Sequence, residues 1–478
     1  MLDIKLGNQL SKDDFDALDD DLRNRLLGIQ GSLQSSGTPL LIVIHGLDGS
    51  GKGVLLTELG ARMNPRLFRT HSFWDTDSCH ASLPFFARYW NALPPRGTTA
   101  IHLGAWYEKM FDKATGKQDI SPDIETVRQF EQTLADNGTK ILKIFLHLDQ
   151  KTQKQRLKAK EKLLSTDSSV LKMKALRSKS YKQATKHHDF ILSSTQEPHA
   201  PWHVIDASDP DWALARTAEL ILAVDPADLA GASAPSLEPS RAGTLEAVTD
   251  FPVLERKEYK KRKQELQDEL FALSWKAWQQ KKSPILVFEG WDAAGKGGNI
   301  RRITEAIDPR LWTVHGSSAP NEVERQHHYL WRYWKTLPRA GMTSIYDRSW
   351  YGRVLVERVE SFATEAEWKR AYREINEFEN HLADWGGIVL KFWLHISPDE
   401  QKRRFENREE VDYKNYKIND EDWRNRAKWD AYEEAADDMF NRNSTDHAPW
   451  IVVPANDKYY ARVAVLEQVV SALRERLR

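Results

Sequence analysis

The sequence has almost no cysteine and no long apolar run. Cys79 is the only cysteine among 478 residues, which excludes a disulfide framework within the chain and fits a reducing compartment. No uncharged apolar stretch approaches the roughly 20 residues of a membrane span. The N-terminal stretch MLDIKLGNQLSKDD is acidic and polar, unlike a signal peptide. We therefore expect a cytoplasmic protein with no membrane partner.

The chain also lacks an excess of charge of either sign. Lys and Arg number 69 against 70 Asp and Glu, for a formal net charge of -1. This balance argues against bulk attraction to nucleic acid, so a polyanionic partner would need a local basic channel. The sequence contains neither C-x-x-C nor H-E-x-x-H, the usual signatures of redox dithiols and zinc proteases.

An internal repeat is the most informative feature that is present. Gly46 aligns with Gly290, and the pairing runs without a gap from His45–Met110 to Glu289–Val354. DGSGKG faces DAAGKG, and ARYWNALPPRG faces WRYWKTLPRAG. After a short shift the match resumes, with HAPWHVIDASD facing HAPWIVVPAND. This order and colinearity indicate a duplicated domain rather than two unrelated ones.

The two copies are separated by a stretch rich in Ala, Pro, Ser and Gly, from Asp225 to Pro252, which is typical of a linker. We predict a first domain over residues 1–224, a linker over 225–252 and a second domain over 253–478.

Each copy alternates short apolar runs with amphipathic stretches of helical length. In the second copy the apolar runs are PILVFE, LWTVH, TSIYD, GIVLKFWLHI and WIVVPA. Continuous apolar runs between helices predict a buried parallel sheet flanked by helices, hence a doubly wound α/β domain. The stretch EAEWKRAYREINEFENHLADWGG shows helical periodicity through Ile375, Phe378 and Leu382, with Gly386 as its expected end.

The stretch GWDAAGKGG, from Gly290 to Gly298, satisfies the phosphate-loop pattern G-x-x-x-x-G-K directly after an apolar run. Gly290 and Gly295 would let backbone N–H groups turn toward phosphate, and Lys296 would bridge phosphate oxygens. Gly297 stands where Ser or Thr usually ligates Mg²⁺, whereas Asp292 places a carboxylate inside the loop. The bland alternative is a glycine-rich turn with a surface lysine.

A second carboxylate is expected at the end of a neighbouring strand, as in other phosphate-loop enzymes. Asp347 ends the run TSIYD, and Arg348 follows it with a guanidinium suited to a phosphoryl group. Asp292 and Asp347 together predict a Mg²⁺ site. The alternatives are a helix N-cap for Asp347 and an ordinary turn residue for Asp292.

A highly charged segment, Glu400 to Tyr432, follows the fourth apolar run of the second copy. In phosphate-loop kinases this region is a lid whose basic residues stabilise the transferring phosphate. A solvated helix face is the alternative for any single residue. The predicted phosphate-binding residues of this basic helical lid are Arg404, Arg408, Lys417, Arg424, Arg426 and Lys428.

The second copy resembles the polyphosphate kinase 2 family in GWDAAGKGG, DRSWYGR, LPRAG, QKRRFENR and STDHAPWIVVPANDK. The resemblance implies a P-loop kinase fold and Mg²⁺-dependent transfer between inorganic polyphosphate and nucleotides. It implies metal-side carboxylates at Asp292 and Asp347 and phosphate clamps at Lys296 and Arg348, and it places Asp422 in the basic lid motif. The fused arrangement further implies, by analogy of architecture, the subgroup that phosphorylates AMP to ADP.

The first copy keeps the loop but loses its partners. Leu103 and Gly104 stand where the second copy has Asp347 and Arg348. We therefore predict a first domain that folds but is catalytically inactive, with Asp75 or Asp77 as the nearby candidates for replacement ligands.

Three other functions stay open at this point. They are a polyphosphate-dependent ADP kinase, an ATP-dependent nucleoside monophosphate kinase, and a phosphate-sensing regulator without turnover. Gly297 and Asp292 argue against the second, and the intact second copy argues against the third. The oligomeric state is also open, and a homo-oligomer is compatible with the sequence.

Overall fold

The computed structural model describes residues 1–73, 82–112, 121–164, 181–227, 234–238, 243–409 and 420–477. The chain divides into two compact units. The first comprises Met1–Thr76, Tyr89–Ala232 and Arg325–His328; the second comprises Asp77–Arg88, Ser233–Glu324 and Tyr329–Arg478. Among the described residues, no helix combines the length and hydrophobicity that crossing a bilayer requires.

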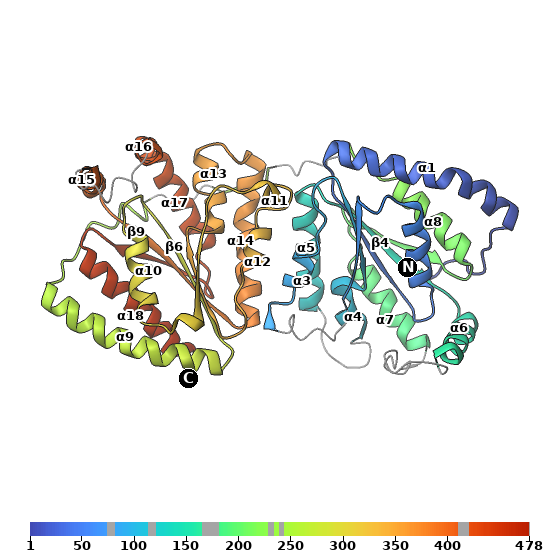
Figure 1. The fold of residues 1–478 in the computed structure, drawn as a ribbon, viewed down its shortest axis with the longest axis horizontal. Coiled ribbons are helices and arrows are strands. Elements are labelled where there is room, and N and C mark those ends of the chain that lie inside the picture. Colours follow the sequence, from blue (N-terminus) through green and yellow to red (C-terminus); the bar gives the residue numbers. More distant parts are fainter. Residues whose placement is uncertain are drawn as a thin grey trace. The chain divides into compact units, whose positions relative to one another are not determined.

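The first unit is built on a five-stranded parallel sheet in the order β2-β3-β1-β4-β5. Its strands are β1 (Leu40–Gly46), β2 (Phe68–Ser72), β3 (Thr99–Leu103), β4 (Lys140–His147) and β5 (Trp202–Asp206). Its helices are α1 (Lys12–Ser36), α2 (Lys52–Arg62), α3 (Ala87–Trp90), α4 (Glu108–Asp112), α5 (Ser121–Asp136), α6 (Gln150–Leu164), α7 (Tyr181–Ser194) and α8 (Pro210–Leu222). Helices α1, α2 and α8 pack together on one face of the sheet, and α5 lies on the other (Figure 1).

The second unit repeats this topology strand for strand, in the order β10-β9-β6-β8-β7. Its strands are β6 (Ser283–Gly290), β7 (Trp312–Gly316), β8 (Thr343–Asp347), β9 (Gly387–His395) and β10 (Trp450–Pro454). Its helices are α9 (Arg256–Gln279), α10 (Lys296–Thr304), α11 (Glu322–Arg325), α12 (Trp331–Lys335), α13 (Val356–Val359), α14 (Glu365–Trp385), α15 (Pro398–Glu409), α16 (Asp420–Ala427), α17 (Trp429–Asn443) and α18 (Lys458–Arg476). Helices α9, α10 and α18 cover one face of the sheet, and α14 covers the other (Figure 1).

These elements confirm the predicted α/β class and all five predicted strands of the second copy. Strand β6 is buried along almost its whole length because it lies in the middle of the sheet, between β8 and β9. Helix α14 begins at a capping box formed by Thr364 and Glu367 and ends at Gly386, which adopts a left-handed conformation. Its apolar stripe, Ile375, Phe378 and Leu382, is buried as predicted.

The C-terminal end of the predicted linker over 225–252 contacts the second unit. Leu245 is buried, and the backbone N–H groups of Gly243 and Leu245 donate to the Asp437 carboxylate of α17 at 2.8 and 3.3 Å. The described residues 243–252 therefore pack as part of the second unit. Composition alone could not show this, because a Gly- and Ala-rich segment suits an extended arm as well as a linker.

The same arm begins the first unit. The N-terminal amine of Met1 and the backbone N–H of Leu2 donate to Asp189 of α7 at 2.6 and 2.7 Å. Asp189 and Asp437 occupy aligned positions of the repeat. In each unit two backbone nitrogens of a segment that precedes its first helix therefore bind a carboxylate at the same aligned position.

A buried lysine in the middle of the fourth strand is common to both units. In the second unit the Lys391 amine donates to the Glu379 carboxylate of α14 at 2.7 Å and to the Tyr351 hydroxyl at 2.8 Å. Glu379 also accepts hydrogen bonds from the Trp350 indole and the Tyr351 hydroxyl. Burial lowers the pKa of the Lys391 amine, and the charge of Glu379 acts in the opposite direction. The network ties the sheet to α14 and to the turn that follows β8.

The first unit keeps this network atom for atom. Lys143 donates to Glu131 at 2.8 Å and to the Tyr107 hydroxyl at 2.9 Å, and Glu131 accepts from the Trp106 indole. The side chains of the ion pair are fully buried in both units. The sequence carried a readable signal, since one lysine interrupts the apolar run in both GIVLKFWLHI and KILKIFLHL.

Replacing Lys391 with Met tests how much this network contributes to the stability of the second unit. We expect the free energy of unfolding to fall by about 3–5 kcal/mol, because the buried Glu379 carboxylate would lose its counter-charge. The double variant Lys391→Met/Glu379→Gln should recover part of the loss, since no uncompensated charge remains. Urea unfolding of the full chain measures both, and an unchanged midpoint for the single variant would contradict the expectation.

Candidate active site

The glycine loop of the second unit (Gly290–Lys296) connects β6 to α10 at the carboxyl edge of the sheet. Gly290 has φ +135°, and a Cβ built on it would lie 2.4 Å from the carbonyl oxygen of Leu394. No other residue fits there without moving β9. Gly295 has φ +106° and precedes α10, whose first turn contains no acidic residue and receives no side-chain cap. The N–H groups at this helix end favour an anion.

Gly297, where a hydroxyl residue is usual, lies in the first turn of α10. A Cβ built on it would meet no heavy atom within 4 Å, so packing does not demand glycine at this position. A Ser or Thr side chain would therefore fit at this position, and Gly297 removes a hydroxyl ligand without relieving a steric clash.

The side chain of Lys296 contacts the backbone at the start of the glycine loop. Its amine donates to the carbonyl oxygens of Gly290 at 2.7 Å and Trp291 at 3.2 Å. Burial lowers the pKa of Lys296, while the carboxylates of Asp292 and Asp347 act in the opposite direction. The first unit holds Lys52 in the same way, with its amine 2.7 Å from the carbonyl oxygen of Gly46.

Asp292 is paired on both of its carboxylate oxygens. One oxygen accepts from the Arg348 guanidinium at 2.8 Å, and the other accepts from the Asn425 amide of α16 at 3.0 Å. Burial tends to raise the pKa of Asp292, but the positive charges of Lys296 and Arg348 outweigh it, and the pKa lies below its ordinary value. The structure thus places two predicted residues, Lys296 and Arg348, around the predicted Asp292 carboxylate.

Asp347 and Arg348 lie where β8 ends, beside β6. Asp347 is the register partner of Phe288, and the Arg348 N–H donates to the Phe288 carbonyl at 3.0 Å. Arg348 has φ +62°, a left-handed conformation that side chains other than glycine adopt at a cost of about 1 kcal/mol or more. Strain of this kind gathers at functional sites, and here it directs the guanidinium onto Asp292.

The donor set suits Mg²⁺ better than a tightly caged metal. In the described part of the chain, no group of three or more His, Cys, Asp or Glu is arranged to hold a metal ion. Asp292 and Asp347 remain, both close enough to Lys296 to influence its pKa. Mg²⁺ commonly uses one or two carboxylates together with waters and substrate phosphates, so two carboxylates are a sufficient protein share.

Glu289 is a residue of this site that the sequence reasoning missed. It accepts hydrogen bonds from the Ser349 backbone N–H at 2.8 Å and from the Ser349 hydroxyl at 2.9 Å. Burial raises the pKa of the Glu289 carboxyl, and the charges of Lys296 and Arg348 counteract it. Glu289 fixes the backbone directly after Arg348. Its signal was a single carboxylate ending the apolar run PILVFE.

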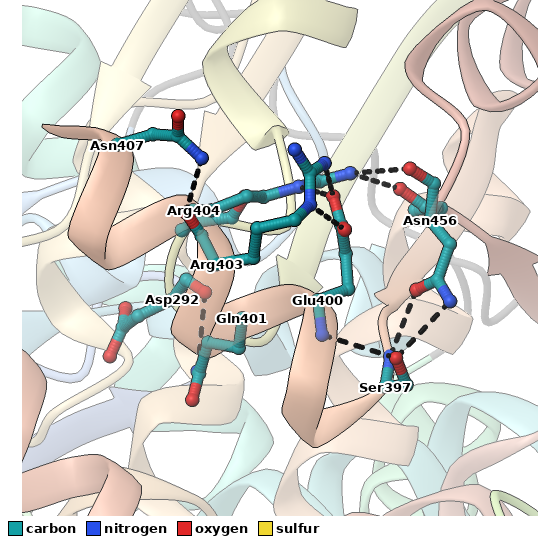
Figure 2. A network of polar contacts seen from close by, with 10 residues as sticks. Asp292, Ser397, Glu400, Gln401, Arg403, Arg404, Asn407 and Asn456 are labelled. Atoms are coloured by element: carbon teal, nitrogen blue, oxygen red, sulfur yellow. Dashed lines mark hydrogen bonds and ion pairs between the residues drawn. The ribbon is translucent and has the colours of Figure 1, made fainter.

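Arg404, one of the predicted lid arginines, lies on α15 and contacts the glycine loop. Its guanidinium donates to the carbonyl oxygens of Ala293, Ala455 and Asn456 at 2.6–2.9 Å and to the Glu400 carboxylate (Figure 2). The side chain is 4% exposed. In this structure Arg404 therefore braces the glycine loop against α15 and the end of β10, and its predicted contact with phosphate stays a prediction. Sequence alone does not distinguish a guanidinium held by carbonyl oxygens from one that faces phosphate.

The brace is present in the first unit as well. Arg156 donates to the carbonyl oxygens of Gly49 and Ser208, which align with Ala293 and Asn456. Gln401 donates its amide to the Asp292 carbonyl at 3.2 Å (Figure 2). In the first unit Gln153 donates to the Asp48 carbonyl at 3.1 Å. Both glycine loops therefore rest on the same support.

The other predicted lid residues divide into two sets. Arg424 and Lys428 approach the Glu360 carboxylate at 3.9 and 2.8 Å, and Arg426 donates to the Pro398 carbonyl at 2.7 Å and to the Gln401 side chain. Those whose side chains lie outside the described residues are Arg408, Lys417 and Asp422.

The first unit differs where the second has its charged pair. Gly104, at the position of Arg348, has φ +78°, so the positive φ is preserved without the guanidinium. Glu108 fills the neighbouring space: its Oε2 lies 3.4 Å from His45 Nε2 and would be 2.3 Å from a Cβ on Gly104. His45 itself takes the place of Glu289. The candidate replacement ligands Asp75 and Asp77 lie outside the described residues.

Fold and site together define a duplicated α/β protein in which a glycine loop meets a strand-end acidic and basic pair in only one of its units. The polyphosphate kinase 2 family model matches residues 9–228 and 253–478, so the chain belongs to the polyphosphate kinase 2 family. It is 38% identical to the polyphosphate:AMP phosphotransferase of Pseudomonas aeruginosa over 98% of this chain and 97% of that one. It is 35% identical to the polyphosphate:AMP phosphotransferase of Acinetobacter johnsonii, over 92% of both chains.

A crystal structure from Pseudomonas aeruginosa PA01, assigned to polyphosphate kinase 2, matches this fold with a TM-score of 0.88 at 38% identity. The match covers 99% of this chain and 98% of that chain. A shorter relative, NDP-polyphosphate phosphotransferase 3 of Ruegeria pomeroyi, is 41% identical over 45% of this chain and 72% of its own length. The full-length matches, unlike this shorter relative, therefore cover both units of the chain.

A matched pair of substitutions tests the role of the left-handed turn. Arg348→Gly should change the free energy of unfolding by less than about 1 kcal/mol, because relief of backbone strain offsets a half-exposed ion pair. Gly104→Arg should destabilise by about 1–3 kcal/mol, since it introduces that strain and displaces Glu108 from His45. Urea unfolding of both full-length variants gives the comparison, and equal costs would refute it.

Proposed function

We propose that the second unit transfers a phosphoryl group from inorganic polyphosphate to AMP, giving ADP. The observation that carries the proposal is the arrangement of Asp292, Lys296, Asp347 and Arg348 at the carboxyl edge of one sheet. Full-length relatives named polyphosphate:AMP phosphotransferases support the choice of donor and acceptor. An adenine nucleotide and polyphosphate are thus the expected partners, and the single cysteine supports a cytoplasmic location.

Phosphoryl transfer asks the protein mainly for positioning and for neutralisation of charge. In this proposal the N–H groups of the glycine loop hold phosphate oxygens, and Lys296 and Arg348 counter the charge that develops on the transferred group. Asp292 and Asp347 would hold Mg²⁺, which supplies further positive charge to the phosphates. To do so, Asp292 would have to share its oxygens with Arg348 and Asn425 or leave them.

The first unit, in the same proposal, is a structural copy without turnover. Lys52 and the glycine loop are held as in the second unit, yet Leu103, Gly104 and His45 replace the carboxylate, the guanidinium and Glu289. The residues that support the glycine loop are thus common to both units, whereas the charged residues beside it are not.

The acceptor is tested by incubating the protein with AMP and Mg²⁺ and either polyphosphate or ATP, followed by measurement of ADP. We expect ADP from polyphosphate and little from ATP beyond any contaminating kinase. A parallel reaction with ADP as acceptor tests the alternative, because shorter relatives that match 45–46% of this chain are named for ADP or NDP substrates. ATP formation from ADP without ADP formation from AMP would overturn the acceptor, and inactivity with every polyphosphate would overturn the donor.

A further inference from the structure

Two basic side chains, from α16 and from the start of α17, approach the same carboxylate. Arg424 and Lys428 stand four residues apart, on successive turns, and both approach Oε2 of Glu360. Lys428 donates to it at 2.8 Å, and the Arg424 Nε lies 3.9 Å away. Glu360 comes from a different segment, at the C-terminal end of α13. The contact therefore holds the start of α17 against the region after the strand-end turn.

Glu360 differs from its partners in exposure. Its side chain is 9% exposed, whereas those of Arg424 and Lys428 are 54% and 40% exposed. Its second oxygen, Oε1, is buried and has no hydrogen-bond partner among the residues that the structure describes. A buried carboxylate with an unsatisfied oxygen depends on its cations, and removing them leaves an uncompensated charge. The two cations, by contrast, are solvated and lose little when their partner changes.

We propose that Glu360 is an internal counter-anion that competes with the polyphosphate chain for Arg424 and Lys428, and so limits the affinity for the donor. The inference rests on the proposed function, with polyphosphate as donor, and on the prediction from the sequence that the basic residues of the lid receive this donor. A donor that recruits these two residues must replace the Glu360 carboxylate as their partner. An unpaired Glu360 then also repels the incoming phosphates. An internal competitor of this kind selects against weakly charged ligands, because only a strongly charged ligand can displace the Glu360 carboxylate.

Other contacts hold the glycine loop against α16 and α17 without Glu360. Asn425, on the same helix, faces Asp292, and Trp429 stacks on Trp291 with ring centroids 3.6 Å apart. Neither contact involves Glu360. Removing the carboxylate should therefore alter donor binding while leaving the glycine loop and its helix in place.

The test measures equilibrium binding of long-chain polyphosphate to the full-length protein without nucleotide, for example by calorimetry, and AMP binding separately. Glu360→Gln keeps the size of the side chain and removes its charge. We expect its dissociation constant for polyphosphate to fall by about three- to tenfold, the loss of one or two half-exposed ion pairs that the ligand must otherwise break. The dissociation constant for AMP should not change, whereas a general loss of structure would weaken both.

Two further variants serve as controls. Glu360→Asp keeps the charge and should bind polyphosphate within about twofold of the original protein. Glu434→Gln removes the same charge from α17, where Glu434 is exposed and pairs with Arg358, and should likewise leave polyphosphate binding nearly unchanged. If Glu360→Gln is unstable by circular dichroism, Glu360→Ala replaces it with the same expected direction.

The outcomes separate this inference from the proposed function. Polyphosphate binding that is unchanged or weaker in Glu360→Gln, with binding by the original protein intact, would overturn the inference alone. An equal gain in Glu434→Gln would also overturn it, because net charge would then explain the effect. Absence of polyphosphate binding by the original protein and every variant would overturn the proposed function, and the inference with it.

Discussion

The fully buried ion pair between a strand lysine and a helix glutamate is the interaction on which both units depend. In the second unit it joins Lys391 of β9 to Glu379 of α14, and Glu379 also holds Trp350 and Tyr351. Those aromatic residues lie just after Asp347 and Arg348, so the pair fixes the turn that carries the charged site. Lys391 also donates to the Asn443 carbonyl at the end of α17, so the buried pair contacts that helix as well.

The two units show which parts of this design belong to the fold and which to the chemistry. The buried pair, the arginine brace and the lysine of the glycine loop occur in both. Differences gather at the strand-end turn, where Gly104 and Glu108 occupy the space that Arg348 needs. A unit can therefore lose its charged pair and keep its architecture, because the network that supports the turn lies below the surface that would meet a ligand.

Much of the architecture was accessible from the sequence because it follows from local patterns and from the repeat. Apolar runs predicted the strands, and the stripe ending at Gly386 predicted α14. The repeat also identified the loss at Leu103 and Gly104. What sequence could not decide was where a long basic side chain ends: Arg404 contacts carbonyls, and Lys428 contacts Glu360, which lies far away in the chain. Such partners depend on tertiary position, and so does the role of Glu289.

The central claim is that only the second unit turns over polyphosphate. The most direct measurement compares Lys296→Ala and Lys52→Ala in the full chain, by the rate of ADP formation from AMP and polyphosphate. Both lysines donate to equivalent carbonyl oxygens, so the two substitutions disturb equivalent contacts. We expect a loss of at least about 100-fold for Lys296→Ala, from a missing transition-state contact, and near-normal turnover for Lys52→Ala. Abolished turnover in Lys52→Ala with activity retained in Lys296→Ala would contradict it.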